Sequence, residues 1–151
     1  MKEEKGKRLK NNYLILFQPD LCLKKGTKLI MEINSNEQNL LIYKKYSDLY
    51  YYAYHLLEKY PKNERFALTS DIKNSMNTSL KLILYAQKVF EIKEKLNYLN
   101  LLDAELMYQR FMIRISFDKK YISQNNYRTW SYKIAEIGKM LGGWIKSCQK
   151  K

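Results

Sequence analysis

Cysteine, histidine, proline and glycine are all scarce in this chain of 151 residues, and each scarcity excludes something. The two cysteines, Cys22 and Cys148, are too few and too far apart to indicate a disulfide framework or a metal knuckle. The single histidine, His55, cannot supply the two Glu-x-x-His motifs of a di-iron or di-manganese four-helix bundle. We therefore expect neither a metal ion nor a cofactor.

Long apolar runs are also missing. The longest early run, Tyr13 to Phe17, is stopped by Gln18-Pro19-Asp20, whereas a bilayer span needs roughly 20 apolar residues. No small-residue cleavage site follows it, so the run does not indicate a signal peptide. The sequence predicts a cytoplasmic protein without a membrane partner.

No set of catalytic residues emerges either. A nucleophile pair would have to join the lone histidine to a cysteine in the irregular start or near the end of the chain, and neither is a credible site. The only glycine pair is followed by Trp144, not by the Lys-Ser of a phosphate-binding loop. Asp103 and Glu105 point to different sides of a helix. These absences predict a binding protein rather than an enzyme.

What the chain does have is helical periodicity, because two prolines and five glycines interrupt it little. Apolar residues recur at steps of three and four in four segments, which run from Ile42 to Tyr60, from Ile72 to Phe90, from Leu99 to Phe117 and from Trp130 to Trp144. Four helices of about 20 to 25 residues joined by short turns predict an all-α fold, an antiparallel up-down four-helix bundle.

The expected ends of these helices follow from local signals. Pro61 ends the first helix, and the second begins in the cap-rich stretch 63–70. The pattern loses register around residues 91–95, which predicts a turn, and Ser123 is the expected N-cap of the fourth helix. Residues 1–30 show no helical stripe, so we expect a poorly ordered extension or upstream sequence before Met31, and a bundle domain over residues 31–151.

The first helix carries more aromatic surface than one bundle seam needs. Its additional tyrosines are Tyr43, Tyr50, Tyr51, Tyr52 and Tyr54. A helix that is apolar on several sides is usually buried on several sides, so this surplus predicts a subunit interface and a homo-oligomer. The alternative is that these tyrosines tolerate water and simply lie on the solvent-exposed face of the helix.

Positive charge is in excess, since 28 Lys and Arg stand against 15 Asp and Glu, a net charge of +13. Such a surface attracts polyanions. Arg110 and Arg114 share one helix face, and residues 119–151 contain one acid, Glu136. The alternative is an ordinary solvated helix face, but such a face does not require so large an excess of basic over acidic residues. The candidate nucleic-acid-binding residues are Lys73, Lys81, Lys88, Arg110, Arg114, Lys119, Lys120, Arg128, Lys133, Lys139 and Lys146.

Gly138 and Gly142 leave two bare backbone patches on one face of the fourth helix. Each glycine costs that helix roughly 0.5–1 kcal/mol relative to alanine, so a compensating gain is expected. The close approach of another helix would supply it. The alternative is ordinary fraying of the C-terminal turns.

Two segments resemble a known family. Residues 59–68, with Pro61, Arg65 and Phe66, and residues 136–147, with the run Gly142-Gly143-Trp144, are similar to segments of the accessory variability determinant (Avd) proteins of diversity-generating retroelements. The resemblance covers about residues 33–147 and departs over residues 1–30 and at Tyr60 and Asn63, where that family more often has Phe and Ser. The first segment is shared with the four-helix-bundle proteins encoded in intervening sequences of 23S ribosomal RNA genes, whereas the second is more specific to Avd proteins.

The resemblance implies a function. Avd proteins are basic four-helix bundles that assemble as homopentamers and associate with the retroelement's reverse transcriptase and template-repeat RNA, so we expect these partners, and possible DNA binding, for this chain. The polymerase chemistry belongs to the reverse transcriptase. The alternatives are an intervening-sequence-type protein and a purely structural oligomer; a bundle-type nucleotide transferase would need acidic metal ligands or a phosphate loop, which we do not find.

Overall fold

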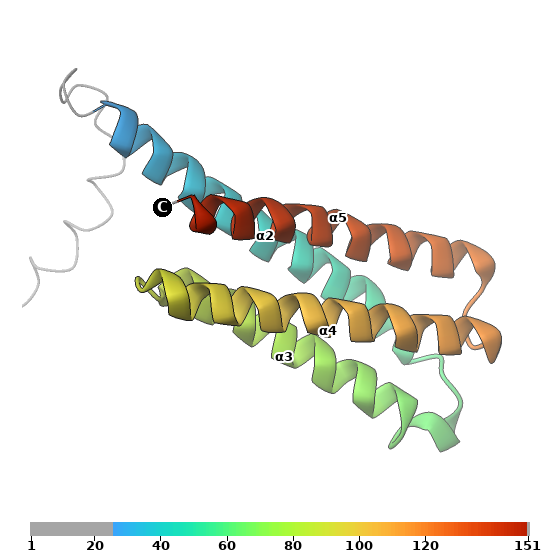
Figure 1. Cartoon of the computed structure of the whole chain (residues 1–151). Coiled ribbons are helices and arrows are strands. Elements are labelled where there is room, and N and C mark those ends of the chain that lie inside the picture. Colours follow the sequence, from blue (N-terminus) through green and yellow to red (C-terminus); the bar gives the residue numbers. More distant parts are fainter. Residues whose placement is uncertain (1–25, 151) are drawn as a thin grey trace, which may run out of the picture. The chain divides into compact units, whose positions relative to one another are not determined.

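The computed structural model describes the backbone of residues 26–150 and the side chains of residues 41–150. Its elements are α2 (Gly26–Leu57), a 3-10 turn η1 (Lys62–Glu64), α3 (Leu68–Lys88), α4 (Ile92–Asp118) and α5 (Gln124–Gln149) (Figure 1). No strand occurs among these residues. The predicted all-α four-helix bundle is confirmed.

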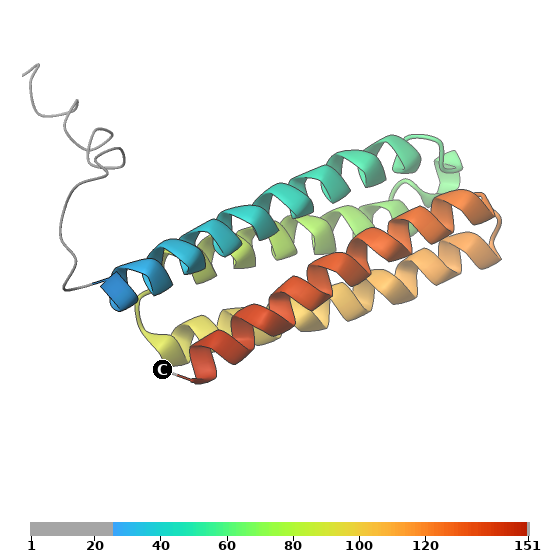
Figure 2. The same cartoon turned by 90° about the horizontal axis from the view of Figure 1, so that it is seen from above.

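The bundle belongs to the compact unit that begins at Ser35. Within it α3 packs against α4 and α4 against α5. Hydrogen bonds join α2 to both of its neighbours, because Tyr50 donates to Asn77 of α3 at 2.7 Å and Tyr52 to the backbone oxygen of Asn126 of α5 at 3.4 Å. The order around the bundle is therefore α2, α3, α4, α5, with successive helices antiparallel (Figure 2).

The predicted apolar stripes form the core. The first stripe is buried throughout, and Trp130, Ile134, Ile137, Leu141 and Trp144 are buried on α5. Burying one such side chain contributes about 1.5–3 kcal/mol, so these stripes supply the main driving force for the bundle. One member was wrong: Phe90 is 99% exposed, because α3 ends at Lys88 and the chain is already extended there.

Two helix ends show how the sequence sets the connections. Ser123 caps α5, as predicted, and its hydroxyl accepts from the Asn126 amide at 3.2 Å. At the end of α4, Lys120 adopts a left-handed conformation with φ of 60°, and the amide of Tyr121 donates to the Ser116 carbonyl at 2.9 Å. The Lys120 amide donates to Phe117 at 2.8 Å, which completes a Schellman cap. This cap turns the chain toward α5.

Other helix boundaries differ from the expectation. α4 begins at Ile92, so most of the predicted turn at residues 91–95 is helical and the connection occupies residues 89–91. The start of α3 at Leu68, by contrast, lies within the predicted stretch 63–70, although the residue before it, Ala67, makes no side-chain capping bond. α2 begins at Gly26, so residues 26–30 of the expected extension are helical. The expectation of a poorly ordered extension otherwise concerns residues 1–25, which lie outside the described residues.

Some of the surplus tyrosines of α2 are used within the chain. Tyr50 and Tyr52 donate to neighbouring helices, and the Tyr54 ring stacks against Tyr50 with centroids 6.4 Å apart. Tyr51 is the most exposed at 70%, and Tyr43 is also exposed. Two of the five tyrosines thus find polar partners on other helices, while Tyr43, Tyr51 and Tyr54 remain exposed. The subunit interface expected on this helix stays a prediction.

Candidate nucleic-acid interface

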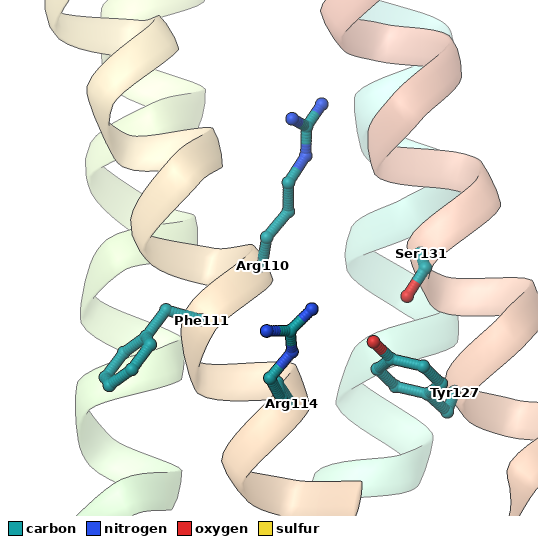
Figure 3. Close-up of a pocket in the computed structure, with 5 residues that line it drawn as sticks. All are labelled: Arg110, Phe111, Arg114, Tyr127 and Ser131. Atoms are coloured by element: carbon teal, nitrogen blue, oxygen red, sulfur yellow. The ribbon is translucent and has the colours of Figure 1, made fainter.

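Arg110 and Arg114 lie one turn apart on the side of α4 that faces α5. Both are exposed, and within residues 41–150 neither forms an ion pair. In Figure 3 both guanidinium groups extend from α4 into the space between the two helices. The predicted shared face is therefore present in the structure, and its charges are free to meet an anion.

These arginines line a hollow of about 450 Å³ together with Phe111 of α4 and Tyr127 and Ser131 of α5. The hydroxyl groups of Tyr127 and Ser131 face it from α5, whereas the Phe111 ring is directed to the far side of α4 (Figure 3). Guanidinium and hydroxyl groups all donate hydrogen bonds. The hollow therefore offers donors from two helices and no carboxylate.

Gly138 is part of this arrangement. A Cβ atom added to Gly138 would lie 2.9 Å from Nη2 of Arg110, whereas one added to Gly142 or Gly143 would meet nothing within 4 Å. The sequence predicted the approach of another helix at Gly138 and Gly142. The structure instead brings an arginine side chain of α4 to Gly138 and leaves Gly142 open within the chain.

The outer side of α5 carries a second basic group, the α5 outer stripe, formed by Arg128, Lys139 and Lys146. Their separations of 11 and 7 residues are close to whole numbers of helical turns, and all three are exposed. The only acid of this helix, Glu136, accepts an ion pair from Lys45 of α2 at 2.8 Å. The hydrogen bond and the charge of Glu136 raise the pKa of Lys45. The negative charge of α5 is thus directed to α2, away from Arg110 and Arg114.

Two of the predicted lysines are partly engaged inside the bundle. Nζ of Lys73 lies 4.2 Å from the centroid of the Tyr54 ring, and Nζ of Lys133 lies 5.6 Å from that of Tyr52. Both are half-buried. Their cation–π contacts with α2 make them weaker candidates for nucleic acid.

The remaining predicted lysines lie elsewhere. Lys81 and Lys88 are exposed on α3, which is diagonal to α5, and Lys119 and Lys120 are exposed in the α4–α5 connection. The eleven predicted residues therefore do not form one patch. The α4–α5 side collects the arginine pair and the α5 outer stripe, and α3 presents its lysines on a separate side.

The residues that carry the family resemblance have unequal roles. Trp144 is buried in the core, while Pro61, Arg65 and Phe66 are exposed in the α2–α3 connection. This connection is tied to the α4–α5 connection, since the hydroxyl of Tyr121 donates to Glu64 at 2.9 Å. The Tyr121 ring also lies 5.5 Å from that of Tyr60.

One internal site was missed by the sequence analysis. Gln109 is 1% exposed, and its Nε2 lies within hydrogen-bond distance of the hydroxyls of Tyr46, Ser75 and Ser79, at 3.1, 3.2 and 2.9 Å. Its two N–H groups can therefore serve two of these three hydroxyls at a time. Ser75 in turn donates to Glu105 at 2.5 Å. Burial raises the pKa of Tyr46 to about 12. The available signal was the seven-residue gap between Leu106 and Ile113 in the apolar stripe, in which position 109 falls on the same face.

Two further properties concern the described residues alone. None of their helices is long and apolar enough to cross a membrane. They also contain no group of three or more His, Cys, Asp or Glu side chains that could hold a metal ion. His55 is exposed, with Nδ1 3.7 Å from Glu58.

Comparison with known proteins gives one family and one fold. A family model described as bAvd-like matches residues 40–148. No curated protein matches the chain. A solved structure of a protein of unknown function from the S23 ribosomal protein family of Bacteroides thetaiotaomicron is 18% identical with a TM-score of 0.67, covering 72% of this chain and 98% of that one. At this identity the likeness concerns the fold.

Proposed function

The chain belongs to the bAvd-like family, and from this membership we propose that it is a non-catalytic accessory protein of a diversity-generating retroelement. In this role it binds the element's reverse transcriptase and its template RNA or the cDNA, and so supports mutagenic reverse transcription. The chemistry of polymerisation stays with the reverse transcriptase.

The observation that carries the proposal is the unneutralised positive charge on the α4–α5 side. Arg110 and Arg114 have no ion-pair partner within residues 41–150, and the single acid of α5 is held by Lys45. Phosphate contacts fix the position of a nucleic acid on a protein without reading its sequence. This side suits a structured RNA whose sequence is read by the polymerase rather than by the accessory protein.

Self-association is part of the proposal. On the outward face of α4 lie four large apolar side chains at helical spacing, Leu101, Met107, Tyr108 and Phe111, between 42 and 62% exposed. Large apolar side chains exposed together on one helix face are typical of a protein interface. We place the contact between copies of this chain, a homopentamer as expected from the resemblance, on α4 rather than on α2.

The test of RNA binding is charge reversal of the α5 outer stripe in the triple variant Arg128→Glu, Lys139→Glu and Lys146→Glu. Affinity for the element's template RNA is measured by fluorescence anisotropy over a series of salt concentrations. Each lost phosphate contact lowers the slope of log affinity against log salt by about 0.7 to 0.9, so we expect weaker binding and a slope flatter by about 2 to 3.

The matched control reverses three lysines outside the α4–α5 side, Lys44→Glu, Lys59→Glu and Lys62→Glu, all exposed. It changes the net charge equally, so equal losses in the two variants would show a diffuse charge effect and contradict binding at this side. The second arm is co-purification with the reverse transcriptase of the same element at physiological salt. Absence of a complex with that enzyme would contradict the accessory role.

A further inference from the structure

We infer that the hollow between α4 and α5 is a discrete phosphate-binding site, in which Arg110 and Arg114 hold one phosphate group and Gly138 positions Arg110. The binding of phosphate is a property of the hollow itself. That the phosphate belongs to a nucleic-acid strand rests on the proposed function.

The lining chemistry matches an oxyanion. Arg110 and Arg114 enter from α4, and the hydroxyls of Tyr127 and Ser131 enter from α5. A guanidinium presents N–H donors in a planar fork that pairs two at a time with phosphate oxygens. The hydroxyls add donors from the opposite wall, so a tetrahedral anion can be contacted from both helices.

The charges around the hollow leave this positive potential uncancelled. Glu136 on α5 is paired with Lys45 at 2.8 Å, and Asp118, one turn beyond Arg114, lies outside ion-pair distance of it. The two guanidinium groups that line the hollow repel one another. An anion between them attracts both, and these two attractions offset the repulsion. The free protein therefore holds a site whose electrostatics improve on binding.

The size of the hollow favours a phosphate with part of its ester. At about 450 Å³ it exceeds the space that one phosphate group needs and falls within the range of roughly 300–1,000 Å³ of small-ligand sites. The remaining space can take a sugar or ordered water. A nucleotide unit of a strand therefore suits it better than a bare ion.

The α5 wall is held in place before any ligand arrives, and Gly138 leaves room for Arg110. The ring of Tyr127 stacks on Phe117 with centroids 4.8 Å apart and an angle of 20° between the planes, which fixes the direction of its hydroxyl. Arg110 lies against the bare backbone of Gly138, where a Cβ would stand 2.9 Å from Nη2. Since Gly138 contributes no side chain to the hollow, its role is to leave room for the guanidinium.

The first experiment uses inorganic phosphate as the probe. Thermal melting of the full chain is followed against phosphate concentration, with chloride replacing phosphate at constant ionic strength and pH. We expect a rise in melting temperature that saturates with phosphate. The double variant Arg110→Gln, Arg114→Gln should melt as the parent does in chloride and lose at least tenfold in phosphate affinity. A parent protein that melts identically in phosphate and chloride overturns the site.

The role of Gly138 is tested by a matched pair of substitutions on one helix. Gly138→Ala and Gly142→Ala add the same methyl group, but only the first meets Arg110. Both should melt no lower than the parent in chloride, because alanine favours a helix over glycine. Phosphate affinity should fall severalfold in Gly138→Ala and stay unchanged in Gly142→Ala. Equal phosphate affinity in the two variants overturns the positioning role.

The source of the phosphate is identified with short single-stranded RNA carrying either a 5′-phosphate or a 5′-hydroxyl. Tighter binding of the phosphorylated form, lost in the double arginine variant, assigns the site to a strand terminus. Equal binding of both forms, displaced by inorganic phosphate, assigns it to the backbone. RNA binding that ignores both phosphate and the double variant shows that the strand does not occupy the hollow.

These results separate the two proposals. Saturable phosphate binding without RNA binding would leave the site standing and contradict the accessory function. Salt-dependent RNA binding without a specific effect of phosphate would support the accessory function and contradict the phosphate-binding site.

Discussion

The amide of Gln109 and the hydroxyl of Tyr46 meet at the centre of the bundle, where Nε2 of Gln109 donates to the Tyr46 oxygen at 3.1 Å. Tyr46 in turn donates to the carbonyl of Met76 at 3.2 Å. This contact joins α2 to α4 across the diagonal of the bundle and to α3 beside it. A buried polar network in which the members satisfy one another fixes the relative rotation of helices more strictly than apolar packing alone.

Replacing Gln109 by Leu should therefore destabilise the protein although it makes the core more apolar. The hydroxyls of Tyr46, Ser75 and Ser79 lose the amide whose two N–H groups they share, and leaving buried polar groups unsatisfied costs about 1–3 kcal/mol. Urea denaturation measures the change. The control is Met107→Leu on the exposed face of the same helix, which should have little effect; a Gln109→Leu protein as stable as this control would contradict the prediction.

Tyr60→Phe should have the opposite sign. The Tyr60 hydroxyl is buried and forms no hydrogen bond of good geometry within the described residues, and the Ser116 side chain near it lowers the pKa of Tyr60 less than burial raises it. Removing it relieves an unsatisfied group, so we expect the free energy of unfolding to rise by about 1 kcal/mol. Phe is also the residue more frequent here in the family that the segment resembles. The comparison is with Tyr46→Phe. The Tyr46 hydroxyl is hydrogen-bonded, so its removal should lower the free energy of unfolding.

The stability of the protein should fall at alkaline pH. Burial raises the pKa of both Tyr46 and Tyr60 to about 12, from the ordinary value of 10.0. Between these values the unfolded chain loses protons that the folded chain keeps, so the free energy of unfolding decreases as pH rises through this window. The slope approaches about 1.4 kcal/mol per pH unit for each tyrosine. Urea midpoints from pH 9 to pH 11.5 measure it, and Tyr60→Phe should flatten the decline by its own share.

Lys120→Gly should stabilise the protein. Lys120 has a φ of 60°, which strains a residue with a Cβ and suits glycine, so we expect a gain of about 1 kcal/mol. Lys119→Gly is the matched control, because it removes the same charge from a right-handed position with φ of −77° and should bring no gain. Thermal melting of both variants decides; equal shifts would show that charge rather than backbone strain is responsible.

The proposed oligomer should dissociate when the outward face of α4 is made polar. In the double variant Met107→Glu, Phe111→Glu two exposed apolar side chains become charged, so folding should be retained while association is weakened. Light scattering at low micromolar concentration measures the mass. Tyr43→Glu with Tyr51→Glu on α2 is the control, and loss of the oligomer in that variant alone would return the interface to α2.

Apolar spacing predicted the four helices and most of the core because burial depends on position along a single helix. The pair Arg110 and Arg114 followed from the same periodicity. Tyr127 and Ser131 could not be predicted opposite them, since which faces of α4 and α5 meet depends on the rotation of both helices in the bundle. Phe90 was misplaced because its spacing matched a stripe although the helix had already ended.

The partners of the α2 tyrosines could not be predicted for a related reason. The sequence shows how many aromatic rings surround a helix but not which of them reach a polar partner. The hydroxyls of Tyr50 and Tyr52 find Asn77 and Asn126, so surface that counted as surplus serves the single chain. A tyrosine-rich helix is therefore a weaker sign of association than a helix whose exposed residues are Leu, Met and Phe.

The ion pair between Lys45 and Glu136 has a consequence for the approach of a charged partner. It leaves α5 without an uncompensated negative charge, while the other acidic residues within residues 26–150 lie on α2, α3, α4 and their connections. The resulting dipole exerts a torque on the molecule in the field of a polyanion and turns α5 toward it before contact. Such orientation during diffusion can raise encounter rates by about 10- to 1,000-fold at low salt. The association rate of the protein with its partner, and not only the dissociation rate, should therefore depend on ionic strength.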